Sequence, residues 1–143
     1  MIIEFRKEHM HVFSGQSNRL FKEIVNGDAR AFSFEEDDFF PVFKWDGKTI
    51  PFGALSCGTQ DQIYFAIKLS LLQLVNGTTG GTGGARRLPL FLDDPFVNFD
   101  HERRKRVLTL LKKIAASHQL FLFTYDPWYI EELKNEAHLI SIE

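Results

Sequence analysis

Two short apolar runs in the C-terminal half of the chain end abruptly in polar side chains. Residues 90–94 are leucine, phenylalanine and leucine followed by two aspartates, and residues 120–124 are four apolar residues followed by a threonine. Apolar runs of this length are typical of strands buried on both faces of a parallel sheet. Ligands of open α/β sheets bind at the carboxyl ends of such strands. We therefore predict a parallel pair of buried strands with acidic groups at its ligand-binding edge.

Helical patterns lie between these runs and after them. Residues 101–117 repeat apolar side chains at three- and four-residue intervals, which predicts a helix. A short helix at about 128–135 and a last strand at 138–142 are expected to follow. Strands and helices in this alternating order predict a parallel α/β fold. In the helix predicted at 101–117, the side chains that we expect to face the core are Val107, Leu108, Leu111 and Ile114.

The N-terminal segment has a sparser pattern. Residues 3–25 are predicted to be helical, with a break at Ser14 and Gly15 and a stop at the asparagine, glycine and aspartate that follow. Widely spaced apolar positions are typical of a helix that leaves a larger body, such as the end of a coiled coil. We therefore divide the chain into a helical segment, residues 1–27, and a main unit, residues 28–143.

The middle of the chain changes from a strand pattern to a helix pattern. Residues 31–52 alternate and are rich in aromatic side chains, which predicts a small antiparallel sheet with a hairpin turn at Asp46 and Gly47. Its prolines, Pro41 and Pro51, are expected at edges or bulges.

A long helix and a loop are predicted next. Residues 59–75 are apolar nearly all round, which predicts a buried helix, and Ser56 is a suitable N-cap for it. Residues 76–85 are rich in glycine and threonine and predict a flexible surface loop. No lysine followed by serine or threonine ends this loop, so it is not a phosphate-binding P-loop.

Composition narrows the class of protein. The chain has 143 residues, the size of a single domain, and a formal net charge of -2, which gives no overall basic field for nucleic acid. Cys57 is the sole cysteine, so the chain has no internal disulfide, as suits a reducing cytoplasm. No apolar stretch approaches the ~18 residues of a membrane span. We expect a cytoplasmic protein without a membrane partner.

Three polar segments follow one another along the chain. Residues 56–59 form a small-residue turn at a helix start, Asp93 and Asp94 end a strand, and residues 124–126 end the next strand. Amides at a helix N-terminus bind anions, and a carboxylate at a strand end can hold Mg²⁺. In this order the three segments predict a site for a phosphate and its metal ion.

These segments resemble the motifs of a known family. Residues 55–62 resemble the signature motif of ABC-type ATPase heads, and most closely of the SMC-related group that includes chromosome-maintenance and double-strand-break repair ATPases. Residues 90–94 resemble the Walker B strand, residues 97–100 resemble the D-loop, and residues 124–125 lie where the family has its switch residue. Over residues 31–143 the resemblance implies an α/β fold. It is the C-terminal lobe of a P-loop NTPase head, with parallel strands, flanking helices and a small antiparallel β-hairpin region.

The resemblance also implies roles for single residues. Asp93 would hold Mg²⁺ through water, and Asp94 has the position of the general base that orients the attacking water. Tyr125 has the position of the switch residue. The remaining residues would act across a dimer of heads: Ser56, Gly58 and Thr59 at the γ-phosphate of ATP held by the opposite protomer, and Asn98 and Asp100 in the D-loop at the interface.

The sequence departs from the family pattern in several places. Asp94 and Tyr125 stand where Glu and His are commonest, and Cys57 stands where Gly is usual. No G-x-x-x-x-G-K-[ST] motif occurs, so the lysine that clamps the β- and γ-phosphates is absent from these residues. We therefore expect ATP and Mg²⁺ to bind only together with an N-terminal Walker A lobe, on the same or a separate chain. The resemblance implies a homodimer of heads that works in DNA repair or chromosome maintenance. It leaves DNA open as a partner.

Two other functions remain open. A non-catalytic interaction module with the same fold would bind a partner or DNA through the basic residues 103–106, which are otherwise a solvated helix face. A metal hydrolase that uses Asp93 and Asp94 without a nucleotide is the least favoured. Four of the five histidines show no spacing typical of metal ligands: His9, His11, His101 and His118.

Overall fold

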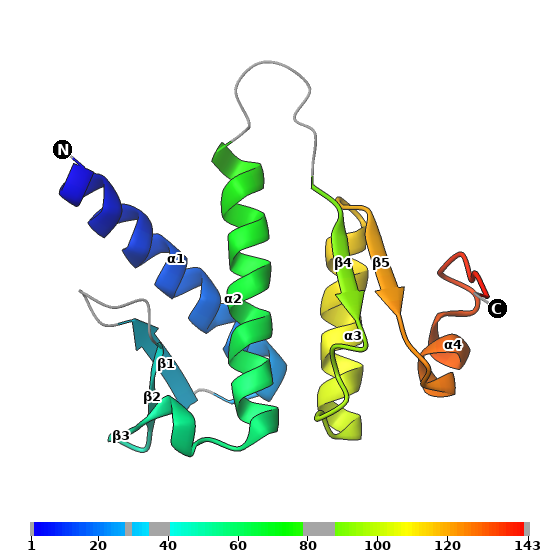
Figure 1. Cartoon of the computed structure of the whole chain (residues 1–143), viewed down its shortest axis with the longest axis horizontal. Coiled ribbons are helices and arrows are strands. Elements are labelled where there is room, and N and C mark those ends of the chain that lie inside the picture. The colour runs from blue at the N-terminus through cyan, green and yellow to red at the C-terminus, as the bar shows by residue number, and fades with distance from the viewer. Residues whose placement is uncertain (1, 28–29, 35–40, 79–87, 142–143) are drawn as a thin grey trace.

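The computed structural model describes residues 2–27, 30–34, 41–78 and 88–141. Two units follow one another in Figure 1: helices beside a small antiparallel sheet, then a parallel strand pair with its own helices. The elements in chain order are α1 (Ile2–Val25), β1 (Arg30–Phe34), β2 (Pro41–Trp45), β3 (Lys48–Ile50), the 3-10 helix η1 (Phe52–Ala54), α2 (Cys57–Thr78), β4 (Leu90–Asp93), α3 (His101–Ala115), β5 (Leu120–Phe123) and α4 (Pro127–Leu133).

The antiparallel sheet has the order β1–β2–β3, which confirms the sheet predicted from residues 31–52. The hairpin between β2 and β3 turns at Asp46 and Gly47, whose φ angles are 50° and 71°. Positive φ at both central positions is typical of the two-residue hairpin turn that this dipeptide predicts. Phe32 of β1 and Phe43 of β2 lie opposite each other and are both buried.

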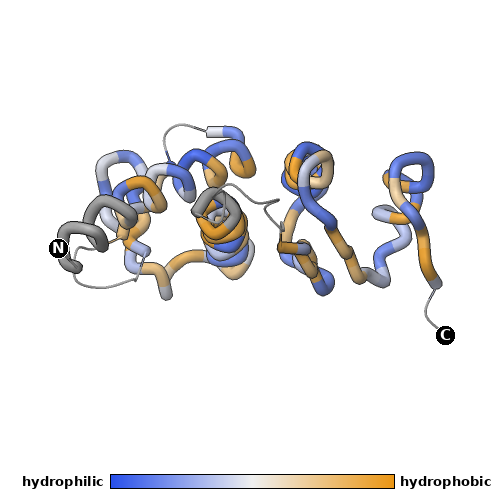
Figure 2. The backbone as a smooth tube through the Cα atoms, turned by 90° about the horizontal axis from the view of Figure 1, so that it is seen from above, coloured by the Kyte–Doolittle hydropathy of each residue, from blue (hydrophilic) through white to orange (hydrophobic). Residues whose placement is uncertain are grey.

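The second sheet consists of β4 and β5, which pair in parallel as predicted. The prediction that these strands are buried on both faces is wrong. Leu92 is buried, but Phe91 and Phe123 are 61% and 42% exposed. Figure 2 shows the reason: α3 covers one face of the strand pair, and no described element covers the other. Apolar side chains alternate between the two faces, so one set remains open to solvent.

One hydrophobic core joins the elements that surround it. Phe21 of α1 is fully buried and packs edge-to-face on Phe32 and Phe43, with ring centroids 5.5 and 5.9 Å apart. The predicted core positions of α3 are confirmed, and Leu110 is buried with them. The same cluster includes Leu20, Ile24, Phe52, Ile63, Phe65, Ala66, Leu69, Leu92, Phe96, Phe99 and Tyr129.

The two long helices differ from their predictions. α1 continues through Ser14 and Gly15 without a break. Gly15 is exposed, but Phe13 and Ser17 on either side of it are buried, and the packing of these two residues keeps the helix intact at Gly15. A helix-interior glycine costs about 1 kcal/mol relative to alanine, which such packing offsets. α2 is not buried all round; its exposed apolar side chains are Tyr64, Leu71 and Val75, 40–47% exposed.

The predictions for two further segments, residues 138–142 and 76–85, also differ from the structure. The predicted strand at 138–142 is wrong for its described residues, because residues 138–141 have no strand partner and are exposed. The prediction of a loop at 76–85 is wrong for residues 76–78, which belong to α2, and residues 79–85 lie outside the described part of the chain.

Candidate functional site

The first part of the site is the turn that follows β4. Asp93 is the last residue of the strand and is exposed, whereas Asp94 is partly buried and has a φ of 39°. The backbone N–H of Asp94 donates to the carbonyl oxygen of Phe123 at 2.8 Å. This bond continues the parallel pairing by one residue and places Asp94 beside the end of β5. A left-handed φ is uncommon for a residue with a side chain, and such residues cluster at functional sites.

Thr124 supplies the side-chain contact to this acid. Its Oγ1 donates to Asp94 Oδ1 at 2.9 Å and accepts from the N–H of Asp126 at 3.1 Å. The sequence placed Thr124 in the polar turn after β5 but did not predict the bond to Asp94. The structure therefore brings the ends of both strands together, as the parallel sheet predicted.

The turn after β5 is held by one ion pair. Asp126 caps α4, because its Oδ1 accepts from the N–H of Trp128 at 3.0 Å. Its Oδ2 accepts from Arg104 Nη1 at 2.6 Å, and Arg104 Nε donates to the carbonyl oxygen of Phe99 at 3.0 Å. The sequence places Arg104 in a basic cluster and Asp126 in the polar turn after β5, but it does not predict the ion pair between them. An acid at the end of a strand, opposite a basic helix, is the signal that could have joined them.

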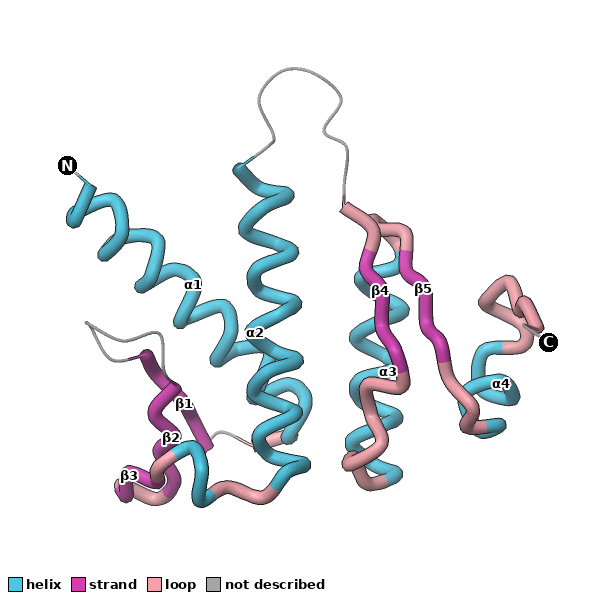
Figure 3. The backbone as a smooth tube through the Cα atoms, in the orientation of Figure 1, coloured by secondary structure: helices cyan, strands magenta, loops and turns pink. Residues whose placement is uncertain are grey.

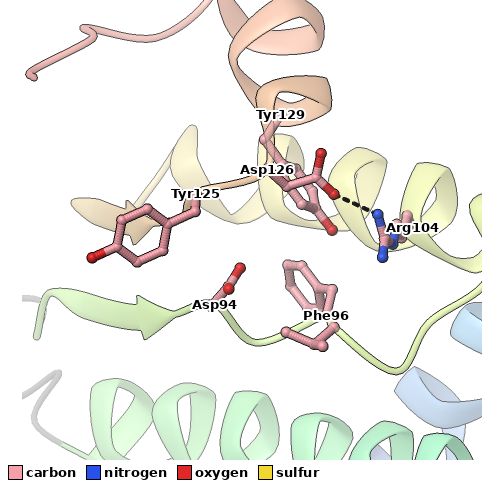
Figure 4. A pocket seen from close by; sticks show the side chains of 7 residues that line it. Asp94, Phe96, Arg104, Tyr125, Asp126 and Tyr129 are labelled. Atoms are coloured by element: carbon pink, nitrogen blue, oxygen red, sulfur yellow. Dashed lines mark hydrogen bonds and ion pairs between the residues drawn. The ribbon is translucent and has the colours of Figure 1, made fainter.

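These side chains surround a cavity of about 270 Å³. Figure 4 shows that Tyr125 lies at its rim, with its ring directed away from Arg104, while the Asp94 carboxylate points into the cavity. Tyr125 is 97% exposed, so its hydroxyl is open to solvent. The residues that line the cavity are Asp94, Phe96, Val97, Arg104, Tyr125, Asp126 and Tyr129.

Tyr129 forms an apolar wall of this cavity and is itself buried. Burial raises the pKa of its phenol from 10.0 to about 12; the nearby Arg104 lowers the pKa, while Asp126 and Asp94 raise it. The hydroxyl has no hydrogen-bond partner among the described residues. The phenol is therefore neutral at physiological pH and cannot serve there as a base.

The second part of the site is the turn at the start of α2. Ser56 Oγ accepts from the N–H of Thr59 at 3.3 Å and lies 3.0 Å from Thr59 Oγ1. The predicted N-cap is thus confirmed. Gly58 lies against the loop between β4 and α3, residues 94–100, because a Cβ added there would be 2.7 Å from the carbonyl oxygen of Asn98. Figure 3 shows this loop descending to the end of the molecule where α2 begins.

Asn98 and Asp100, the two predicted D-loop residues in loop 94–100, both have side-chain partners within the chain. Asn98 Nδ2 donates to Asp61 Oδ2 of α2 at 2.7 Å. Asp100 caps α3, because it accepts from the N–H of Arg103 at 2.9 Å, and its carboxylate also pairs with the Arg103 guanidinium at 3.1 Å. The structure therefore places Asn98 and Asp100 on one loop. The cavity is lined by none of the residues of the turn at the start of α2, Ser56, Gly58 and Thr59.

Few side chains of the described residues could hold a metal ion. Among the described residues, no group of three His, Cys, Asp or Glu side chains lies together. Mg²⁺ is commonly held by one or two carboxylates together with waters and substrate phosphates. The exposed carboxylate of Asp93 fits that donor set, and a site built from protein ligands alone does not.

The basic residues of α3 are largely engaged in ion pairs. The two arginines at its start pair with acids of the chain, as described above, and two lysines in its last turns do the same. Lys112 pairs with Glu136 at 2.7 Å and Lys113 with Glu23 at 2.8 Å. These contacts reduce the positive charge that α3 offers to a polyanion.

No family model matches the chain. Over 128 residues the chain is 34% identical to the uncharacterized protein YhaN of Bacillus subtilis (strain 168); the match covers 88% of this chain but spans only 12% of that protein's length. None of the helices that the structure describes is long and apolar enough to cross a membrane.

Solved structures of SMC heads share this fold. A structure from work on ATP-driven dimerisation and DNA-stimulated activation of SMC ATPases gives a TM-score of 0.66 at 15% identity, over 87% of this chain and 73% of that one. The SMC head domain of Thermotoga maritima gives 0.57 at 17% identity, over 82% and 39%. The Pyrococcus furiosus Smc head bound to the C-terminal domain of ScpA gives 0.64 at 16%, over 89% and 31%.

At identities of 15–17%, the structural similarity to these heads establishes the fold of the chain and nothing more. The chain therefore has the P-loop NTPase fold of the C-terminal part of an SMC head, and it spans about a third of the length of two of these structures.

Proposed function

We propose that this chain, with the fold of the C-terminal part of an SMC head, is the C-terminal lobe of an SMC-like ATPase. It would complete an ATP site across a dimer of heads, with turnover only in the presence of a Walker A lobe. The fold of the solved heads and the order of motifs in the sequence support this assignment.

The open face of the strand pair is the observation that carries the proposal. Phe91 and Phe121 stack there with ring centroids 4.8 Å apart, and Phe91 is 61% exposed. Because side chains alternate along a strand, Asp93 is on the same face. An apolar face that ends in an exposed carboxylate suits a second lobe that brings the phosphates of ATP. Packing of that lobe would place its phosphate site next to Asp93.

Within the assembled site, Asp93, Asp94 and Tyr125 would each have a separate role. Asp93 would hold Mg²⁺ through water, and the metal would supply charge neutralisation at the phosphates. Asp94, whose carboxylate faces the cavity, would accept a proton from the attacking water. Tyr125, exposed at the rim, is free to reach the nucleotide as the switch residue.

The contacts to the opposite protomer would come from the turn at the start of α2 and from loop 94–100. Ser56, Gly58 and Thr59 would present their turn to the γ-phosphate held by the opposite protomer, where the N-terminus of α2 favours an anion. Asn98 and Asp100 would lie at the interface between heads. The DNA-stimulated activation named for one of the solved SMC ATPases supports a role for this chain in DNA repair or chromosome maintenance. We expect that role to be carried out in the cytoplasm.

Calorimetry of Mg-ATP binding tests the proposal directly. The chain alone should bind weakly or not at all, and addition of a Walker A lobe should create a saturable site. The substitution Asp94→Asn should preserve that binding and reduce hydrolysis by at least roughly 100-fold, since general-base catalysis contributes that much. A mixture that binds Mg-ATP no better than the chain alone would refute the proposal. DNA added to an active mixture tests the stimulation.

A further inference from the structure

We infer that Thr124 is the positioning residue for the carboxylate of Asp94, and that Arg104 holds Thr124 in place through Asp126. The inference rests on the proposed function, because it concerns how the general base is aimed. It assigns a role to Thr124, Arg104 and Asp126, to which the sequence motifs give none.

The Thr124 hydroxyl has only one hydrogen to give. Its oxygen already accepts from the N–H of Asp126 at 3.1 Å, so the hydrogen is turned toward Asp94 Oδ1, 2.9 Å away. A β-branched side chain is stiff about χ1, which further limits the directions the hydroxyl can take. One oxygen of the Asp94 carboxylate is thereby fixed, and the other remains to face the cavity.

The turn that carries Thr124 is fixed in its own way. Asp126 uses one carboxylate oxygen to cap α4 and the other to accept from Arg104 at 2.6 Å. The side chains of Arg104 and Asp126 are only 24% and 30% exposed, so water screens their ion pair less than it would on an open surface. The guanidinium also binds the carbonyl oxygen of Phe99. Arg104 therefore ties the turn after β5 to the start of α3.

This arrangement has a catalytic consequence for a short acid. Aspartate is one methylene shorter than glutamate and reaches less far, so the position of its carboxylate must be defined closely. Misplacement of a catalytic group by about 1 Å can reduce the rate roughly 100-fold. A hydroxyl donor on one oxygen restricts the rotation of the carboxylate and leaves the net charge of the site unchanged.

The test compares Thr124→Val, which keeps the shape and removes the hydroxyl, with Thr124→Ser, which keeps the hydroxyl. In this chain, the carboxyl-carbon NMR signal of Asp94 should move in Thr124→Val and stay near its original position in Thr124→Ser. In the head assembled with a Walker A lobe, Thr124→Val should lower kcat by roughly 10- to 100-fold with KM for ATP little changed. Thr124→Ser should retain most of the activity.

The outcomes separate the inference from the proposed function. An unmoved Asp94 signal in Thr124→Val, or equal losses of kcat in both variants, would overturn the inference. An assembled wild-type head that binds and hydrolyses no ATP would overturn the proposed function, while the NMR comparison would still decide whether Thr124 holds Asp94. Arg104→Met should move the Asp94 signal in the same direction as Thr124→Val, and an unmoved signal there would remove Arg104 from the inference.

Discussion

The side-chain amide of Asn98 donates a 2.7 Å hydrogen bond to the carboxylate of Asp61, 37 residues earlier in the chain. The bond joins the loop between β4 and α3 to the first turns of α2. Beside it, the carbonyl oxygen of Asn98 lies so close to Gly58 that no Cβ fits between them. Two segments with separate proposed roles in a head dimer are thus in direct contact within one chain.

Exchange of the two groups tests this bond. Asn98→Asp would place two carboxylates at hydrogen-bond distance and should lower the free energy of unfolding by about 1 kcal/mol. The double variant Asp61→Asn with Asn98→Asp restores one amide and one carboxylate, so most of that loss should return. Urea unfolding followed by circular dichroism measures both. A double variant no more stable than Asn98→Asp would show that the bond does not form in solution.

The close approach at Gly58 gives a second prediction. Gly58→Ala should destabilise the chain by about 1–3 kcal/mol, since the loop must move to admit the methyl group. Gly15→Ala is the matched control, because Gly15 is also in a helix and an added Cβ meets nothing within 4 Å. That variant should stabilise the chain by about 0.5–1 kcal/mol. Opposite signs in thermal unfolding are expected, and stabilisation by both would contradict the contact.

The buried phenol of Tyr129 predicts a pH dependence at alkaline pH. Its pKa is about 12 in the folded chain and 10.0 ordinarily, so between these values the unfolded state loses a proton that the folded state keeps. Stability should therefore fall as the pH rises from 10 toward 12, by up to about 1.4 kcal/mol per pH unit.

Tyr129→Phe should remove this component of the fall. At neutral pH the variant should be as stable as the wild type or slightly more so, because the hydroxyl has no partner among the described residues. Denaturant titrations at a series of pH values give the difference between the two chains. Parallel curves up to pH 12 would show that the phenol is solvated in the folded state.

The open strand face predicts where a second lobe binds. Phe91→Ser should abolish binding of a Walker A lobe and leave this chain folded, because Phe91 is 61% exposed. Ile130→Ser, at an exposed apolar position of α4, is the control and should bind the lobe normally. Pull-down with the purified lobe, alongside circular dichroism, tests both variants. Normal binding by Phe91→Ser would place the lobe elsewhere.

Short-range patterns in the sequence predicted the local structure well. The turn at Asp46 and Gly47, the cap at Ser56 and the core face of α3 depend on backbone preferences and periodicity within a few residues, and all three are confirmed. The parallel pairing of residues 90–93 with 120–123 was also predicted, because strands joined by a helical crossover rarely pair in another way.

Burial and the contacts between distant side chains depend on tertiary packing. Periodicity identifies the apolar side chains of a strand but not what covers them, so it did not by itself predict the open side of β4 and β5. The partners Asp94 and Thr124 are 30 residues apart, and Arg104 and Asp126 are 22 apart. No local pattern joins residues so far apart, because hydrogen bonds between side chains depend on distances that packing alone sets. The sequence identifies the polar side chains that follow the strands, and the positions of α3 and of the turn before α4 decide which of them meet.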